Sequence, residues 1–350
     1  MIFVLSAIFV FGILVILHEL GHFFAAKLSG IKVLEFGIGY PPRVLKFTYK
    51  ETIYSINLLP LGGFVRLLGE EDASLPGSLA SKSKLTRFMV LAAGSFVNAV
   101  LPIIIFSILF MIPQDVPVTD ILVSRVAPQS PAASAGLRQG DIIKKVDGKT
   151  VDNGADLMYR VQLNLGNEIK MEFERAGAPM STTLKPRYNP PDGEGSIGVE
   201  YNPRFNLRTI ERSDPPWIAI PKGFQRTWET LVIFKNGIAQ MFSGGGEARE
   251  VAGPIGIAKI SGEVAREGFS PLFTLVALLS LNLAIINMLP IPALDGGRVL
   301  FLVIEAIRGK PIPAKKEALV HMIGFAILIM LVVVISYFDI ARIVNDGGSN

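Results

Sequence analysis

The stretch IFVLSAIFVFGILVILHELGHFFAA, residues Ile2–Ala26, decides the fold. It holds no basic residue, and its one acidic residue, Glu19, lies between His18 and His22. A helix of about 20 apolar residues crosses a bilayer core roughly 30 Å thick, so the stretch predicts a membrane span. A cleaved signal peptide would begin with basic residues, and none precedes Lys27. The chain is therefore predicted to begin with a transmembrane helix that carries three ionisable side chains.

Three further stretches lack charged residues, and each predicts another span. They are Phe88–Ile112, Gly268–Leu294 and Ala318–Phe338. The 350 residues are 50% hydrophobic and 18% charged, which excludes a disordered chain and argues against a water-soluble globule. The net charge of +4 gives no support to a nucleic-acid partner. The absence of Cys excludes disulfides and thiolate metal ligands.

The distribution of basic residues predicts how the chain crosses the membrane. The segment Lys27–Arg87 holds nine Lys or Arg residues, and Arg298–Lys316 holds five. The N-terminus has none, and the tail after Phe338 has only Arg342. Short basic connections stay in the cytoplasm, so both termini and the long segment 113–267 are predicted to lie outside it.

The sequence HELGH at residues 18–22 predicts a metal site. Two imidazoles four residues apart project from one face of a helix, and a Glu between them is typical of the general base of a zinc protease. Each ionisable group within a span costs at least about 2.5 kcal/mol, which favours a compensating cation over a polar cluster in a packed bundle. His18 lies nine residues before Lys27, roughly 13 Å along a helix. The site is therefore predicted within the membrane, toward the cytoplasm.

A catalytic zinc ion takes a third protein ligand, and two residues are candidates. Asp295 lies in the run NMLPIPALDGG, residues 287–297, in which Pro290 and Pro292 break the helix. Broken backbone at membrane depth occurs where it lines a cavity or is buried in protein, so we expect Asp295 to be the ligand. His321, at the start of the fourth span, is the alternative, although its position is more typical of an interfacial or packing histidine.

These motifs resemble the site-2 protease family of intramembrane zinc metalloproteases, and most closely its bacterial regulator-of-sigma-E branch. The likeness covers nearly the whole chain and includes LPLGGFV at 59–65, AAGSFVN at 92–98, where family members often have Pro in place of Ser95, and GPIGI at 253–257. The resemblance implies that His18, His22 and Asp295 bind Zn²⁺. It also implies that Glu19 is the catalytic base and that Asn287 holds the substrate backbone. An ordinary interhelical hydrogen bond is the alternative role for Asn287.

Residues from about 31 to 68 predict a β-hairpin on the cytoplasmic side. Val44–Tyr49 and Thr52–Asn57 have strand patterns on either side of Lys50-Glu51, and Gly37–Pro42 predicts a turn-rich entry. The resemblance implies a hairpin that re-enters the membrane, where an exposed strand edge would accept an unwound substrate as an added strand. Without the resemblance, the segment predicts only a cytoplasmic hairpin.

Residues 113–205 predict an inserted α+β domain. Short alternating strands with Gly and Asp turns fill about 119–201, and SPAASAGLRQGD at 130–141 resembles a bacterial PDZ domain. PDZ domains bind peptides as an added strand, and Ser196–Val199 is the candidate groove. Two roles stay open: peptide binding, and a steric filter that excludes substrates with bulky external parts.

Residues 206–267 predict a linker to the last two spans. Apolar residues recur at helical spacing over Trp217–Phe242, with basic and acidic residues between them. This pattern fits an amphipathic helix on the outer membrane face, and equally a linker helix packed on the PDZ domain. Ser243–Gly246 predicts a flexible joint. Residues 1–112 and 268–350 each hold two spans.

The sequence thus predicts a multi-pass α-helical membrane protein with four transmembrane helices, a cytoplasmic-side β-hairpin and an inserted extracytoplasmic α+β domain. The resemblance implies that the hairpin is re-entrant, that the inserted domain is a PDZ domain and that the membrane is the bacterial inner membrane. By resemblance it is a zinc endopeptidase in regulated intramembrane proteolysis. It would cleave single-pass membrane proteins, such as anti-sigma factors or remnant signal peptides, after an upstream site-1 protease has trimmed them. One alternative is a catalytically inactive membrane PDZ scaffold, which the intact motifs disfavour. The other is a metal carrier, for which one buried site makes a poor conduit.

Overall fold

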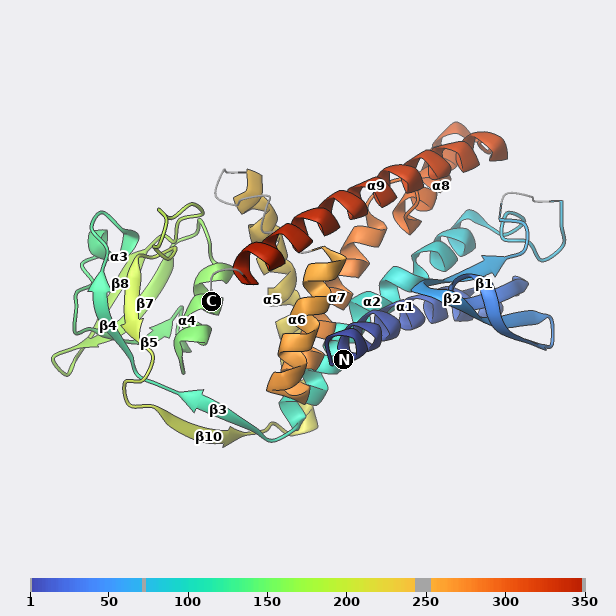
Figure 1. Cartoon of the computed structure of the whole chain (residues 1–350). Helices are drawn as coiled ribbons and strands as arrows, with labels where there is room; N and C mark the ends of the chain where they lie inside the picture. Colours follow the sequence, from blue (N-terminus) through green and yellow to red (C-terminus); the bar gives the residue numbers. More distant parts are fainter. Residues whose placement is uncertain (1, 71–73, 243–252, 348–350) are drawn as a thin grey trace. The chain divides into compact units, whose positions relative to one another are not determined.

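A computed structural model describes residues 2–70, 74–242 and 253–347 (Figure 1). The chain forms two compact units. Unit 1 consists of Met1–Phe106 and Val251–Asn350, and unit 2 consists of Ser107–Glu250. Unit 2 is therefore inserted in sequence between the two halves of unit 1. The predicted joint at Ser243–Gly246 lies outside the described residues.

Four helices among the described residues are long and apolar enough to cross a membrane. They are α1 (Ile2–Leu28), α2 (Lys84–Met111), α7 (Phe269–Met288) and α9 (Ala314–Gly347). All four predicted spans are thus helical, with one correction. The third span ends at Met288 and not at Leu294, because Leu289 has an extended ψ of 144° before Pro290.

Two shorter helices flank α7, and the sequence pattern did not predict either of them. Helix α6 (Pro254–Glu267) precedes α7, and α8 (Asp295–Arg308) follows the loop 289–294. This loop is folded tightly against the first turn of α8. A Cβ at Gly296 would overlap the Leu289 backbone. Ala293, with a φ of 78°, adopts the left-handed region that non-glycine residues rarely occupy. The tight loop places Asp295 at the first position of a helix.

The predicted hairpin is formed by β1 (Val33–Tyr49) and β2 (Thr52–Leu67), which are longer than expected and meet at Lys50-Glu51. The expected turn-rich entry at Gly37–Pro42 lies inside β1, and the chain reverses there: 35–38 run parallel to 53–56, whereas 45–49 run antiparallel to 52–56. Gly37 pairs with both Ser55 and Phe64, and a Cβ at this position would overlap the Phe64 ring. Gly37 therefore serves close packing within the sheet, and Gly39, with a φ of 77°, lies where the chain reverses.

Both strands pair twice, so the hairpin is a sheet of four segments. The pairings give the order 43–49, 52–57, 33–38 and 63–67. Glu35 links all four segments: its buried carboxylate accepts hydrogen bonds from Arg43 and Ser55 and lies 3.4 Å from Arg66 Nη2. The segment 63–67 is an edge without a further strand among the described residues.

Unit 2 contains an antiparallel six-stranded sheet in the order β8-β7-β5-β4-β9, with β6 paired to β5. The strands are β4 (Ile121–Val126), β5 (Ile142–Val146), β6 (Lys149–Thr150), β7 (Ile169–Arg175), β8 (Ala178–Leu184) and β9 (Val199–Asn202). Helices α3 (Pro131–Ser134) and α4 (Gly154–Leu163) complete the domain, and its core includes Ile121, Ile143 and Met171. A separate ribbon pairs β3 (Gln114–Val118) with β10 (Arg208–Arg212).

The predicted linker helix is α5 (Pro216–Phe242), and it packs on α4. Tyr159 of α4 donates a 2.8 Å hydrogen bond to Glu229, and Asn236 donates to the carbonyl oxygens of Gln162 and Leu163. Of the two expected arrangements, packing on the inserted domain is therefore found. The opposite face of α5 keeps apolar side chains exposed, which leaves the second arrangement compatible with the first.

Candidate metal centre

The first two spans approach closely where both carry small residues. A Cβ at Gly21 would lie 2.6 Å from the Ala93 carbonyl oxygen. A Cβ at Gly94 would overlap His22 Nε2 and lie 2.7 Å from His18 Cε1. Small residues of this kind let helix backbones approach within a membrane. This close approach places the imidazoles of α1 directly against the backbone of α2.

The two imidazoles of α1 meet the carboxylate that begins α8. Asp295 Oδ2 lies 3.1 Å from His18 Nε2 and 3.2 Å from His22 Nε2. The two Nε2 atoms are 3.3 Å apart. The three side chains are 9%, 12% and 21% exposed. Among the described residues, this is the one group of His, Cys, Asp or Glu with spacing suited to a metal ion.

The geometry of this group fits a zinc ion. Ligand atoms about 2.0–2.2 Å from a tetrahedral zinc ion stand roughly 3.4 Å from one another, close to the distances observed here. His22 Nδ1 lies 2.8 Å from the Val90 carbonyl oxygen, which can only accept a hydrogen bond. The proton of a neutral His22 is therefore on Nδ1, and Nε2 directs its lone pair toward Asp295. Three electron-pair donors converge, as a cation requires.

Asn98, on α2, contacts the outer nitrogen of His18. Its amide nitrogen lies 3.3 Å from His18 Nδ1, and its buried Oδ1 has no partner among the described residues. A 180° flip of the Asn98 amide, which exchanges Nδ2 and Oδ1, would let His18 Nδ1–H donate to Oδ1 and would free His18 Nε2 for a metal. Ser280 of α7 donates a 2.8 Å hydrogen bond to the Asn98 carbonyl oxygen. The contact between Asn98 and His18 was not predicted, and a lone Asn within an apolar span was the available signal.

Glu19 is one residue after His18 and faces the hairpin. Its carboxylate lies close enough to the Val65 N–H to interact with it electrostatically. A Cβ at Gly63 would lie 3.1 Å from Glu19 Cγ, so the edge segment 63–67 passes directly against this side chain. The candidate base and the strand edge 63–67 are therefore neighbours.

The structure places the two remaining candidate residues, Asn287 and His321, differently with respect to the histidine–aspartate group. The Asn287 amide nitrogen, near the end of α7, lies 3.4 Å from His18 Nε2, which places this amide at the metal centre. His321 does not join the group: its Nδ1 accepts a 3.0 Å hydrogen bond from the Ala293 N–H. Of the two candidates for a third ligand, Asp295 is the one that lies with the two histidines.

Known proteins resemble this chain over nearly its full length. Residues 6–331 match the model of peptidase family M50. A protein of Clostridium acetobutylicum, named as a zinc metalloprotease, is 36% identical, and the alignment covers 98% of each chain. Zinc metalloprotease RasP of Geobacillus kaustophilus is 32% identical, with 97% of this chain and 98% of the relative covered. The regulator of sigma-W protease RasP of Bacillus subtilis is 29% identical, with 97% and 98% covered.

Among solved structures, the PDZ domain of an SdrC-like protein from Listeria monocytogenes aligns with 23% of this chain and 86% of that domain. The two share 20% sequence identity, and the TM-score is 0.21.

Proposed function

Because the chain belongs to peptidase family M50, the site-2 proteases, and is a membrane zinc metalloprotease, we propose that it hydrolyses peptide bonds within or near the transmembrane segments of single-pass membrane proteins. The observation that carries this proposal is the convergence of His18, His22 and Asp295 beside Glu19. An inactive scaffold would have no need of this arrangement. The family assignment and the geometry thus support the same chemistry.

The proposed roles follow from the positions of the side chains. His18, His22 and Asp295 would hold Zn²⁺, which when bound polarises the scissile carbonyl and acidifies water. Glu19 takes the proton from the attacking water and passes it to the leaving amine. The Asn287 amide, 3.4 Å from His18 Nε2, would donate a hydrogen bond to the substrate backbone or to the developing oxyanion. Asn98 and the Val90 carbonyl orient the two imidazoles.

The substrate must unwind before its peptide bonds can be attacked, because a helix buries them in its own hydrogen bonds. We place the unwound segment along the edge 63–67 of the hairpin, as an added strand. Two observations support this location: the edge has no strand partner among the described residues, and Val65 contacts Glu19. A strand added there would run past the candidate base.

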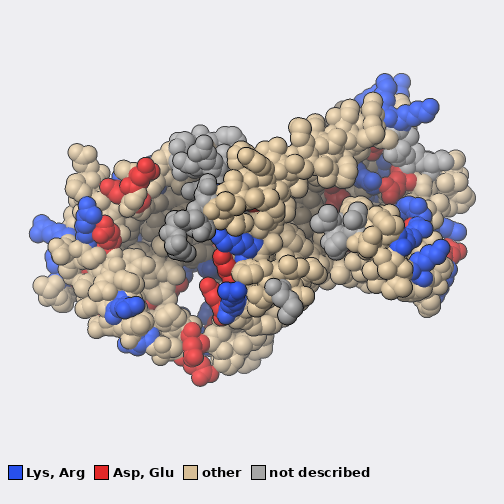
Figure 2. All heavy atoms as spheres, in the orientation of Figure 1, with Lys and Arg blue, Asp and Glu red and all other residues tan. Residues whose placement is uncertain are grey.

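The orientation in the membrane is proposed from charge. Figure 2 shows Lys and Arg gathered at one end of unit 1, near the α8–α9 connection and the hairpin. Exposed members of this group include Lys46, Lys50, Arg308, Lys310, Lys315 and Lys316. By the positive-inside rule this end faces the cytoplasm of a bacterial inner membrane. Both termini and the inserted domain would then be extracytoplasmic.

Substrates and partners are proposed by analogy with the relative named for sigma-W regulation. Anti-sigma factors and remnant signal peptides, trimmed first by a site-1 protease, are the proposed class. For the inserted PDZ domain we favour a steric filter over a peptide receptor. Tyr201 of the edge strand β9 packs directly over Gly154 of α4. The Tyr201 side chain therefore fills the space between β9 and α4 at this end.

Cleavage of a tagged single-span substrate by the purified protein in lipid nanodiscs tests this function. Glu19→Gln should lower the rate at least about 100-fold, because a general base contributes 10²–10⁴-fold, while about one zinc ion per chain is kept. Glu51→Gln is the matched control, since Glu51 lies 68% exposed at the hairpin turn. Cleavage that survives Glu19→Gln would exclude Glu19 as the base. Full zinc content in His18→Ala would exclude the proposed ligand set.

A further inference from the structure

His321 makes a specific contact that a packing histidine would not need. Its Nδ1 accepts a 3.0 Å hydrogen bond from the Ala293 N–H, so Nδ1 must be unprotonated. Its Nε2 lies 4.0 Å from Glu317 Oε1, beside a cavity of about 240 Å³ whose lining includes Glu70 and Arg298. The proton of the neutral ring is therefore on Nε2, which is buried and has no hydrogen-bond partner among the described residues. The nitrogen that faces the loop is the acceptor.

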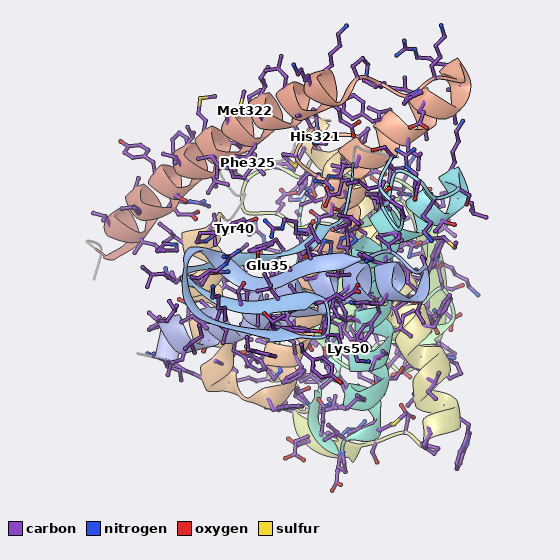
Figure 3. The ribbon with its side chains drawn as sticks, turned by 90° about the vertical axis from the view of Figure 1, so that its right-hand side faces the viewer. Glu35, Tyr40, Lys50, His321, Met322 and Phe325 are labelled. Carbon is purple, nitrogen blue, oxygen red and sulfur yellow. The ribbon has the colours of Figure 1, made fainter. Side chains whose placement is uncertain are left out.

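A second contact, one helical turn along α9, reaches the same loop. A Cβ at Gly324 would overlap Pro292 Cβ and lie 2.8 Å from the Pro292 carbonyl carbon and oxygen. The α9 backbone therefore lies directly against the loop at this residue. His321 and Gly324, three residues apart, share a helix face. Both can be followed from His321, Met322 and Phe325, which Figure 3 labels on α9.

The loop that these two residues contact has few hydrogen bonds of its own. Pro290 and Pro292 have no N–H group. The N–H groups of Ile291 and Leu294 are bonded within the loop, to Leu289 and Ile291. The N–H of Ala293 instead leaves the loop for α9. Ala293 also has the unfavourable positive φ, so an external partner at this residue fixes a conformation that the loop alone would disfavour.

We propose that His321 is a positioning residue for the metal centre: it fixes the loop so that Asp295, two residues after Ala293, meets the two imidazoles of α1. The inference rests on the proposed metal site and extends it to the fourth span. Helix α9 also holds the start of α6, where Asp339 accepts hydrogen bonds from the N–H groups of Gly253 and Gly256. Because His321 is bonded to the loop at Ala293, a displacement of α9 at His321 would also displace Asp295, the proposed third metal ligand.

Metal binding by the full-length protein in detergent tests the proposal without reliance on activity. His321→Leu removes the acceptor at similar size, whereas His321→Asn keeps an acceptor atom near the position of Nδ1. Met322→Leu is the control, because Met322 is the next residue on α9 and is 63% exposed. Zinc affinity is measured by chelator competition, and the ligand field by the absorption spectrum of the Co²⁺-substituted protein.

We expect His321→Leu to weaken zinc binding about 10- to 100-fold, as the loss of a residue that orients a ligand typically does, and to alter the Co²⁺ bands. His321→Asn should restore both toward wild type, and Met322→Leu should change neither. The same affinity and spectrum in His321→Leu as in wild type would overturn the proposal. So would a His321→Asn protein as impaired as His321→Leu, because packing alone would then explain the effect.

Two further outcomes keep this test independent of folding and of the proposed function. If His321→Leu fails to fold, Gly324→Ala replaces it, since the added methyl group must displace Pro292; unchanged zinc affinity in that variant would overturn the proposal. If the folded wild-type protein binds no metal, the metal centre itself is wrong, and this inference is wrong with it. A metal-binding wild type with an unaffected His321→Leu variant contradicts the positioning role alone.

Discussion

Gly94 has no side chain, and the proposed metal centre leaves no room for one. A Cβ at this position would overlap His22 Nε2 and lie 2.7 Å from His18 Cε1. Gly94→Ala must therefore displace the imidazoles or move α2 away from α1. We expect at least a tenfold loss of zinc affinity and a matching loss of cleavage, on the scale of about 10- to 100-fold seen when metal ligands are misoriented.

Gly12→Ala provides the control for this substitution. Gly12 lies in the same bundle, on α1, and a Cβ there meets no atom within 4 Å. Its replacement should leave zinc affinity unchanged, because the added methyl group displaces nothing. Ala also favours the helix over Gly by about 1 kcal/mol, so the helix is not weakened. The zinc retained after dialysis is measured by atomic absorption and compared between Gly94→Ala, Gly12→Ala and wild type. Equal retention by Gly94→Ala and wild type would contradict the geometry of the centre.

The residues of the centre differ in how far the sequence predicts them. His18, His22 and Glu19 follow from one local pattern, because the helical period fixes their relative directions. Asp295 is 273 residues from His22, and the helix-breaking prolines before it were the signal. The contact between Asn98 and His18 depends on the rotation of α2 against α1, which no local pattern encodes. The bond from His321 to the loop likewise depends on how α9 packs.

At the scale of elements, long apolar stretches were sufficient to predict the spans, whereas the shorter helices α6 and α8 were not predicted. Helix α8 lies in a segment that was interpreted only as a basic connection. Gly309, in the left-handed conformation with a φ of 69°, ends this helix and was the available signal. The hairpin was underestimated because its strands bend and pair twice, and periodicity within one strand cannot reveal a second partner.

A buried ion pair joins two elements of unit 2 and makes the stability of this unit depend on pH. Asp141, directly before β5, has a side chain only 1% exposed. It accepts hydrogen bonds from Arg175 of β7 and from the Arg138 N–H. Burial raises the pKa of Asp141, but these bonds outweigh it and hold the pKa below its ordinary value. The stabilisation is therefore complete above about pH 4, the unfolded-state range, and is lost as pH falls through the lower folded-state pKa.

We expect Asp141→Asn to destabilise unit 2 by about 2–4 kcal/mol at neutral pH and to flatten its acid dependence. Both tryptophans of the chain, Trp217 and Trp228, lie in α5, so tryptophan fluorescence during denaturation reports on this unit. Glu200→Gln is the control: Glu200 pairs with Arg125 at 2.9 Å, but the two side chains are 60% and 66% exposed. The loss of unfolding free energy caused by Glu200→Gln should stay within about 1 kcal/mol. Equal effects of the two substitutions would contradict the role of burial.

At the scale of the whole molecule, α5 begins at the end of a membrane span. The Asp214 N–H donates a 2.8 Å hydrogen bond to the carbonyl oxygen of Phe110, which lies in the last turn of α2. The α5 face opposite α4 carries Trp217, Phe224 and Trp228, which are 76%, 62% and 62% exposed. Aromatic side chains of this kind favour the membrane–water interface. We therefore expect α5 to hold the inserted domain against the bilayer surface.

Quenching of tryptophan fluorescence by brominated lipids tests this expectation, because both tryptophans of the chain belong to this face. In nanodiscs, bromine placed near the headgroup should quench them more strongly than bromine near the chain end, as for rings at interfacial depth. Phe224→Asp, about two helical turns from Trp217 and one from Trp228, should weaken the quenching, because it brings a charge to the apolar face. Gly237→Asp adds the same charge elsewhere on α5, where an added Cβ meets no atom within 4 Å, and should not. If lipid bromine quenches neither tryptophan at any depth, the aromatic face does not touch the bilayer, and α5 serves only to brace the inserted domain.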